Sequence, residues 1–140
     1  MFYIGFVSGA RVDASGRRYA IGDATLGEHS QRFEANLDHW STADYERQWR
    51  EAVLRLATGP ESSALVTSYE GGGDGRHIVL PMWREGSAVY VQPPLVLDAD
   101  VEDSSGIYDK IGERGTMSAA AAIAEWQLPL GQLLAFAIDE

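Results

Sequence analysis

Apolar side chains recur at helical spacing between residues 42 and 58, and charged residues occupy the positions between them. The apolar stripe consists of Tyr45, Trp49, Ala52, Val53 and Leu56. Ser41 lies directly before the segment, and Asp44 lies three residues after Ser41, which is the spacing of a capping box. Gly59 suits the residue after a helix, and Pro60 cannot continue one. The pattern predicts an amphipathic helix over about 42–58.

The two faces of this helix have different expected roles. Trp49 lies on the apolar stripe, so we expect it in the core. Trp40 stands directly before the cap and is expected to pack over the first turn of the helix. On the charged face Glu46 and Arg50 stand four residues apart in the order that favours an ion pair, and a second Glu–Arg pair repeats the spacing. Because both tryptophans are expected to pack against the protein itself, they are interpreted as structural residues and not as a binding site.

β-favouring runs precede the helix. Residues 2–8 and 18–22 flank a turn at 13–17, and together they predict an opening hairpin. Residues 22–30 are expected to form a loop. Residues 31–37 alternate between apolar and polar side chains, which predicts a half-buried strand.

Three further runs follow the helix at hairpin spacing. Residues 64–69, 78–83 and 88–92 predict an antiparallel meander. The glycine-rich residues 70–75 are expected to connect the first two strands as a flexible turn. Pro81 lies within the middle run, and because proline has no backbone N–H it predicts a bulge or a sheet edge at that point.

The last third of the chain is less regular. Residues 95–101 predict a strand and 107–111 a helical turn. Residues 119–122 favour a helix by propensity, whereas 123–126 are compatible with a short strand, so the pattern leaves both open. Pro129 suits the first position of a C-terminal helix. That helix is supported by Leu130, Leu133, Leu134, Ala137 and Ile138.

These elements predict one α+β domain over residues 1–140. We expect an antiparallel sheet, made of the N-terminal hairpin and the central three-strand meander, packed with two or three helices. The chain has 140 residues, of which 45% are hydrophobic, enough for one core. It has no cysteine, which excludes disulfides, thiol nucleophiles and thiolate metal sites. Residues 1–10 show neither a basic leader nor a long apolar run, so a cytoplasmic protein without a membrane segment is expected.

Acidic residues outnumber basic ones by 21 to 11, giving a net charge of −10. Such a field repels the phosphate backbone of nucleic acids, so no nucleic-acid partner is expected. The same field attracts a basic protein and accelerates its encounter with the chain. Solubility alone is the alternative interpretation of this charge.

Several short stretches resemble bacterial contact-dependent growth inhibition immunity proteins, the CdiI family. They are His39-Trp40-Ser41, Asp44-Tyr45, Gln48-Trp49, Ser63 to Tyr69, Ala88 to Gln92, and Ile123 to Trp126 with the leucine-rich segment after it. The resemblance covers most of residues 37–138. The alanine run at 119–122 and the glycine turn at 71–75 depart from the family pattern.

The resemblance implies a function without catalysis. Family members act in the cytoplasm and bind the C-terminal toxin domain, often a nuclease, that neighbouring bacteria deliver. It also implies that residues 123–126 form a strand before the last helix. The alternative is an acidic small-molecule-binding or regulatory α+β domain without a toxin partner.

The acidic run after Pro94 is the sharpest polar feature of the sequence. If the strand from residue 95 continues, Asp98, Asp100 and Glu102 share one face of it because strand side chains alternate. With Asp103 they form the expected partner-binding residues, which would complement a basic toxin surface. A solvated strand end is the competing interpretation.

No motif in the chain supports a metal, a cofactor or an enzyme. The run from Asp98 through Asp109 has acidic residues at some calcium-loop positions, but Asp103 stands where the loop requires glycine. The glycines at 71–75 lack the Lys-Ser/Thr ending of a phosphate loop. No serine lies in a nucleophile-elbow motif. The three histidines lack metal-site spacing and are expected in turns or at the surface: His29, His39 and His77.

Overall fold

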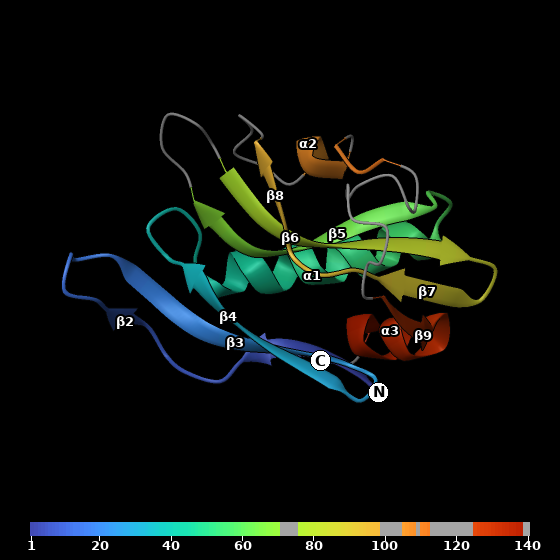
Figure 1. Cartoon of the computed structure of the whole chain (residues 1–140), viewed down its shortest axis with the longest axis horizontal. Coiled ribbons are helices and arrows are strands. Elements are labelled where there is room, and N and C mark those ends of the chain that lie inside the picture. The colour runs from blue at the N-terminus through green and yellow to red at the C-terminus, as the bar shows by residue number, and fades with distance from the viewer. Residues whose placement is uncertain (71–75, 99–104, 109, 113–124, 139–140) are drawn as a thin grey trace.

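The strands of the protein form two antiparallel sheets, and helix α1 (Thr42–Ala57) packs against both (Figure 1). The computed structural model describes residues 1–70, 76–98, 105–108, 110–112 and 125–138. The α+β class is confirmed. The sheet expected to be continuous is divided into two, because the chain leaves the first sheet at the end of β4 and passes through α1 before the second begins.

The first sheet is built around one long central strand. Its members are β1 (Phe2–Phe6), β2 (Arg11–Val12), β3 (Arg18–Leu26) and β4 (His29–Asn36). β1 and β2 pair with successive parts of β3, and β4 pairs with β3 along its length, so the opening hairpin is confirmed. The loop expected at 22–30 was wrong: β3 continues to Leu26, and the chain turns at Gly27 with a φ of +72°.

The extension of β3 depends on Gly22, which the sequence pattern suggested as a loop residue. A Cβ on Gly22 would lie 2.3 Å from the ring of Phe33 on β4, so the glycine is required by close packing within the sheet. Ala24 and Leu26 are buried and alternate with half-buried polar residues. The run is therefore an ordinary strand with one face in the core.

The second sheet contains the predicted meander. Its strands are β5 (Ser62–Glu70), β6 (Arg76–Glu85), β7 (Ala88–Val91), β8 (Leu95–Asp98) and β9 (Trp126–Pro129). The order is β5-β6-β7-β9, and β8 also pairs with β6. The glycine-rich connection 71–75 lies outside the described residues, although Glu70 and Arg76 on either side of it are paired. The sheet is consistent with the expected order of strands.

Pro81 lies in the interior of this sheet, so the bulge or edge expected there was wrong. β6 pairs with β7 through Met82–Glu85 and with β8 through Arg76–Val79. Pro81 falls in the gap between these two partners, where the neighbouring chain is interrupted by Pro93 and Pro94. On that side the residue opposite is Gln92, which lies outside the strands and donates its N–H to the Pro81 carbonyl at 3.1 Å, so only one hydrogen bond is lost through the missing N–H.

The described helices end close to the expected residues. Ser41 and Asp44 form both hydrogen bonds of the capping box of α1, and Gly59 takes a φ of +142° after the helix. α2 (Ser105–Tyr108) is a single turn and α3 is Leu130–Ile138. Of the strand expected at 123–126, residues 123–124 lie outside the described residues; β9 begins at Trp126 and runs to Pro129, so Pro129 precedes the helix rather than opening it. The alanine run 119–122 lies outside the described residues.

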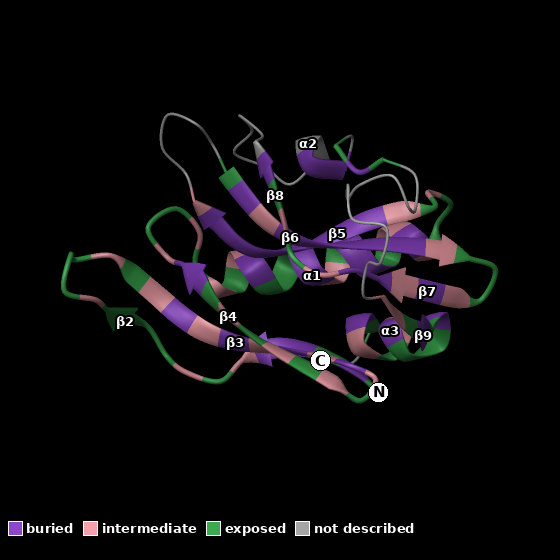
Figure 2. Cartoon of the chain, in the orientation of Figure 1, coloured by how far each residue is buried: buried purple, intermediate pink, exposed green. Residues whose placement is uncertain are grey.

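The core lies between α1 and the sheets. Figure 2 shows buried residues along β5 and β6, whereas β2 is exposed. Trp49 is fully buried and its ring contacts Phe6 and Phe33, while Trp40 packs against Tyr45 in the first turn of α1. The scaffold role predicted for both tryptophans is confirmed.

Two histidines are more enclosed than expected. His77 is fully buried in β6 and stacks on Tyr69, with ring centroids 4.5 Å apart, so the prediction of a turn or surface position was wrong. His29 begins β4 and stacks on Trp126 of β9 at 4.2 Å, which joins the tip of the first sheet to the second. His39 is exposed, as expected. Each enclosed histidine stacks on an aromatic residue of another strand, which explains why patterns within a single strand missed them.

Candidate functional site

Side chains from α1 complete the outer edge of β5. This strand lies at the edge of the second sheet, and the helix directs three side chains toward it: Tyr45, Gln48 and Trp49. Gln48 donates to Ala64 O at 2.8 Å and accepts from Val66 N at 2.8 Å, and Trp49 Nε1 donates to Val66 O at 2.7 Å. Because a buried edge must satisfy its backbone groups, these side chains replace a missing neighbouring strand.

A β-bulge matches the edge of β5 to these donors and acceptors. The register with β6 shifts between Val66 and Ser68. Before the shift, Ala64 and Val66 direct backbone groups toward α1; after it, Tyr69 does so, with its N–H donating to Tyr45 Oη at 2.9 Å. One extra residue changes the parity of a strand, so the bulge allows one helix face to reach both halves of β5.

Tyr45 is held in this network as a neutral phenol. Its hydroxyl donates to Asn36 O at 2.6 Å and accepts from Tyr69 N. Burial raises the pKa of Tyr45 from its usual value near 10 to about 12, against the opposing effect of the hydrogen bond from the Tyr69 backbone. Tyr45 therefore connects β4, α1 and β5 and has a structural role.

The backbone groups at the outer edge of β1 meet no pairing strand among the described residues, whereas those at the edge of β5 bond to side chains of α1. Gly27 N donates to Met1 O and Val7 N donates to Ile21 O, so the odd-numbered residues of this segment direct their backbone groups toward β3. The backbone groups of Phe2, Ile4 and Phe6 consequently face away from β3. Among the described residues no strand pairs with this edge.

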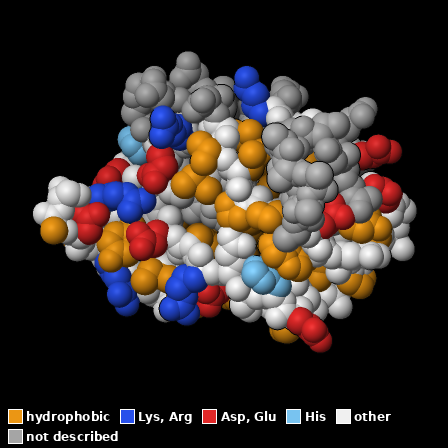
Figure 3. Space-filling view, in the orientation of Figure 1, with side chains coloured by type: hydrophobic (Ala, Val, Ile, Leu, Met, Phe, Trp, Pro, Cys, Tyr) orange, Lys and Arg blue, Asp and Glu red, His pale blue; other side chains and the backbone are white. Residues whose placement is uncertain are grey.

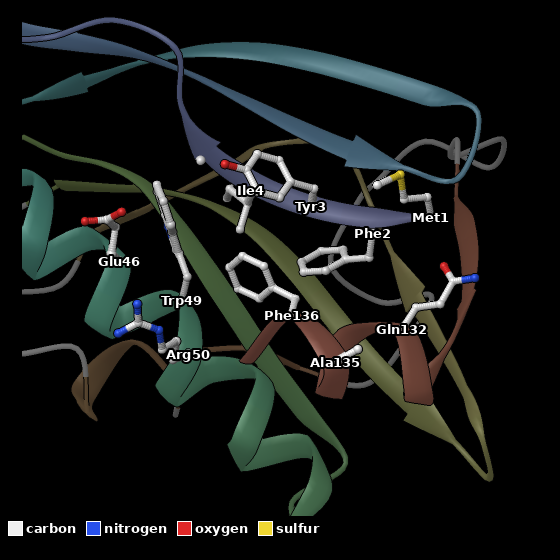
Figure 4. A pocket seen from close by; sticks show the side chains of 11 residues that line it. Met1, Phe2, Tyr3, Ile4, Glu46, Trp49, Arg50, Gln132, Ala135 and Phe136 are labelled. Carbon is white, nitrogen blue, oxygen red and sulfur yellow. The ribbon is translucent and has the colours of Figure 1, made fainter. Parts of the chain in front are cut away.

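A hollow of about 630 Å³ lies along this edge, between β1, α1 and α3 (Figure 4). Most of its wall is aromatic or aliphatic. Its lining residues are Met1, Phe2, Tyr3, Ile4, Gly5, Glu46, Trp49, Arg50, Gln132, Ala135 and Phe136. Phe136 meets Phe2 at 5.2 Å and Tyr3 at 6.1 Å between ring centroids, both edge to face. The three segments that form the hollow are far apart in sequence.

Tyr3 forms an exposed part of this wall. Its side chain is on an edge strand and the residue is 47% exposed. The ring lies over Gly5, where a Cβ would come within 2.3 Å of the Tyr3 hydroxyl. The absence of a side chain at Gly5 thus creates the space in which the Tyr3 ring rests.

The rim of the hollow carries two opposite charges from α1. Figure 4 shows Glu46 and Arg50 together at one end and Gln132 at the other. The ion pair expected between Glu46 and Arg50 was wrong, since no such contact occurs within 4 Å. An exposed helical pair gains only a few tenths of a kcal/mol, roughly, which does not fix two long side chains. Both charges therefore remain available at the rim.

Arg50 also borders a second hollow, on the other side of α1. This hollow has a volume of about 540 Å³ and includes Leu54, which is 40% exposed. At its far side the Arg55 guanidinium lies 4.5 Å from the centre of the Tyr108 ring and donates to Ser62 O. Arg50 thus separates a mainly aromatic hollow from a more open one.

The expected partner-binding residues lie at the limit of the described chain. Asp98 ends β8, opposite Arg76 of β6. Asp100, Glu102 and Asp103 fall outside the described residues, so the predicted acidic face stays a prediction. The alternation leading to it is present, since Val96 is 57% exposed and Leu97 is buried.

Charges of both signs intermingle over the described surface. Figure 3 shows arginines beside carboxylates over β2, β3 and β4, where Arg17 bridges Glu34 and Glu70 and Arg32 pairs with Asp23. Most of the acidic excess belongs, by sequence, to the ranges outside the described residues. The long-range field therefore owes most of its strength to those ranges.

Neither a metal site nor a membrane-spanning helix finds support among the described residues. No cluster of three or more histidine, aspartate or glutamate side chains suited to hold a metal ion occurs among them. None of the described helices combines the length and the apolar character needed to cross a membrane. The candidate site is therefore defined by shape, aromatic walls and rim charges.

Comparison with known proteins agrees with this fold. The family model of the CdiI N-terminal domain matches residues 35–136. A chain of the solved CdiA-CT/CdiI toxin and immunity complex from Enterobacter cloacae shares the fold, with a TM-score of 0.83 at 22% sequence identity over 98% of this chain and 96% of that one. No protein with a curated description matches. The family match extends from the end of β4 to α3, and the chain therefore belongs to the CdiI family of contact-dependent growth inhibition immunity proteins.

Proposed function

We propose that this protein is the immunity protein of a contact-dependent growth inhibition system and neutralises the C-terminal toxin domain of its cognate effector by binding it. The single observation that carries this proposal is the family match over residues 35–136. The solved relative belongs to a toxin and immunity complex, which supports a protein partner. We infer that the protein acts as a single domain in the cytoplasm, by stoichiometric binding and without catalysis.

We further propose that the toxin domain is a nuclease. A nuclease groove is basic because it binds phosphates, and a partner with a net charge of −10 complements such a groove. The expected contact residues Asp98, Asp100, Glu102 and Asp103 add to that field. Their main effect would be on the rate of encounter, as is usual for charges at the rim of an interface.

The test of this function is co-expression with the toxin domain encoded beside the gene. The expected result is that the toxin domain alone stops growth, that this protein restores growth, and that the two proteins co-purify in equal amounts. An unrelated toxin domain serves as the control and should not be neutralised. Continued growth arrest in the presence of the folded protein would refute the proposed function.

The acidic residues have a kinetic test. Changing Asp98→Asn, Asp100→Asn and Glu102→Gln together should slow association with the toxin domain and flatten its dependence on salt. Stopped-flow association at several ionic strengths measures both effects. An unchanged rate at every ionic strength would remove these residues from the interface.

A small-molecule-binding function is the second candidate, and the hollow at β1 favours it. Its volume of about 630 Å³ and its aromatic wall with a few polar groups are typical of ligand sites. A thermal-shift screen of small metabolites distinguishes the candidates when it is combined with the growth assay. A stabilising ligand without growth rescue would support this second function.

A further inference from the structure

We propose that the hollow between β1, α1 and α3 receives one large apolar side chain of the toxin domain. On the toxin, this side chain would be flanked by a basic residue that meets Glu46 and an acidic residue that meets Arg50. The proposal rests on the proposed function and names the surface that carries it out.

The wall of the hollow determines the chemistry of the inserted group. Tyr3, which is 47% exposed, and the half-buried Phe136 present their rings to the hollow, while Phe2 and Trp49 form its buried floor and Ala135 on α3 leaves space beside them. A large apolar side chain placed there leaves water and contacts the rings of Tyr3 and Phe136. Pockets of this kind accept the anchor residues that dominate the affinity of protein interfaces.

The rim determines the neighbours of that side chain. Glu46 and Arg50 stand one helical turn apart on α1, and neither forms an ion pair with a described residue. A partner with one basic and one acidic group at matching positions would satisfy both. Oppositely charged groups at this spacing also fix the direction in which the partner segment lies along α1.

Charge also favours a toxin over a second copy of this chain. Two copies each carry a net charge of −10 and repel one another before any contact forms. A basic toxin domain is attracted instead. The adjoining hollow is lined by Arg47, Arg50 and Arg55 against the single carboxylate Glu51, so acidic groups of the toxin would be the partners at that part of the surface.

The decisive experiment fills the hollow. Ala135→Trp places a ring in the space between the walls, at an exposed helical position. We expect the dissociation constant for the toxin domain of the neighbouring gene, measured by isothermal titration calorimetry, to rise by about 30-fold or more. Ala10→Trp, at an exposed residue outside the hollow, is the matched control and should leave affinity within about threefold of the parent.

A second pair of variants tests the rim. Glu46→Arg should weaken binding by about tenfold, because it opposes the basic group of the toxin. Glu28→Arg, at the exposed turn before β4, changes the net charge equally and is the control for long-range steering. If Ala135→Trp does not fold, as judged by circular dichroism, Tyr3→Ala replaces it, since Tyr3 is an exposed wall residue.

The outcomes separate the two proposals. If the parent protein does not bind the toxin domain, the proposed function is refuted. If the parent binds and both the hollow and the rim variants bind equally well, the function stands and this surface is refuted. If light scattering shows that the parent is a dimer and that Ala135→Trp makes it monomeric, a second copy occupies the hollow and the toxin assignment is overturned.

Discussion

β5 and β1 are both edge strands beside α1, yet of these two edges only that of β5 forms hydrogen bonds with side chains of α1 among the described residues. Along β5, Tyr45, Gln48 and Trp49 provide hydrogen bonds to the backbone, and the edge is sealed. Along β1, no strand of the described part of the chain pairs with the outward backbone groups, and a hollow remains. The comparison shows that one helix serves as a structural cover on one face and as the wall of a candidate binding site on another.

The difference assigns separate roles to neighbouring residues of α1. Gln48 and Trp49 are buried and engaged, whereas Glu46 and Arg50 are more exposed and form no ion pair with each other. Substitutions facing β5 should therefore reduce stability, and those facing the hollow should reduce binding. Stability and affinity are measured independently, so each half of this comparison is testable.

The largest expected loss of stability comes from Gln48→Leu. It removes the bonds to Ala64 O and Val66 N, and two buried backbone groups lose their partners. We expect a decrease of about 2–4 kcal/mol in the free energy of unfolding, measured with urea. Gln132→Leu at the rim is the matched control and should stay within about 0.5 kcal/mol of the parent. Equal effects of the two changes would abolish the distinction between the edges.

A pH dependence sharpens the comparison on the β5 side. The pKa of Tyr45 is about 12 in the folded protein, above its usual 10, so the folded state retains the proton longer than the unfolded state. This contribution is complete below pH 10 and is lost as the pH rises through 12, amounting to about 3 kcal/mol. Urea unfolding at successive alkaline pH values measures it. Tyr45→Phe should be less stable at neutral pH and should lack this alkaline component; an identical alkaline decline in both proteins would contradict the assignment.

Two glycine substitutions test whether the Phe33 ring and the Tyr3 ring can move to make room for an added methyl group. A Cβ at Gly22 would meet the Phe33 ring, which is wedged against Phe6 and Trp49, so Gly22→Ala should lower stability by about 1–3 kcal/mol. A Cβ at Gly5 would meet the free end of Tyr3, which has room to move. Gly5→Ala should therefore change thermal stability by less than about 0.5 kcal/mol. A loss as large as that of Gly22→Ala would mean that Tyr3 is fixed.

Local sequence patterns predicted the elements whose causes are local. The capping box at Ser41 and Asp44, the end of α1 shortly before Gly59, and the meander are set by residues close together in the chain. The extent of β3 was missed because residues 22–30 were expected to form a loop, although the Phe33 ring on β4 requires a glycine at position 22. The cause there is contact between strands.

The candidate site was not predictable for the same reason. Its walls come from the beginning, the middle and the end of the chain, and only the fold brings Tyr3, Trp49 and Phe136 together. The one available signal was Glu46 with Arg50, which helical spacing assigned to an intrahelical pair. The buried position of His77 likewise depends on stacking against Tyr69 of the neighbouring strand.

Because of the bulge between Val66 and Ser68, the number of residues between two positions of β5 decides whether both of them face α1. Deleting Thr67, the extra residue of the bulge, would let Ser68 follow Val66 directly and would keep both Val66 and Tyr69 facing the helix. Deleting Leu65 would instead make Ala64 and Val66 neighbours, so only one of them could direct its backbone toward α1. The deletion at Leu65 should therefore be far more harmful than the deletion of Thr67, whereas an added residue at the exposed turn around Gly86 should be tolerated. A deletion scan across these two regions, read out as the free energy of unfolding, would measure how strictly each region requires its present length.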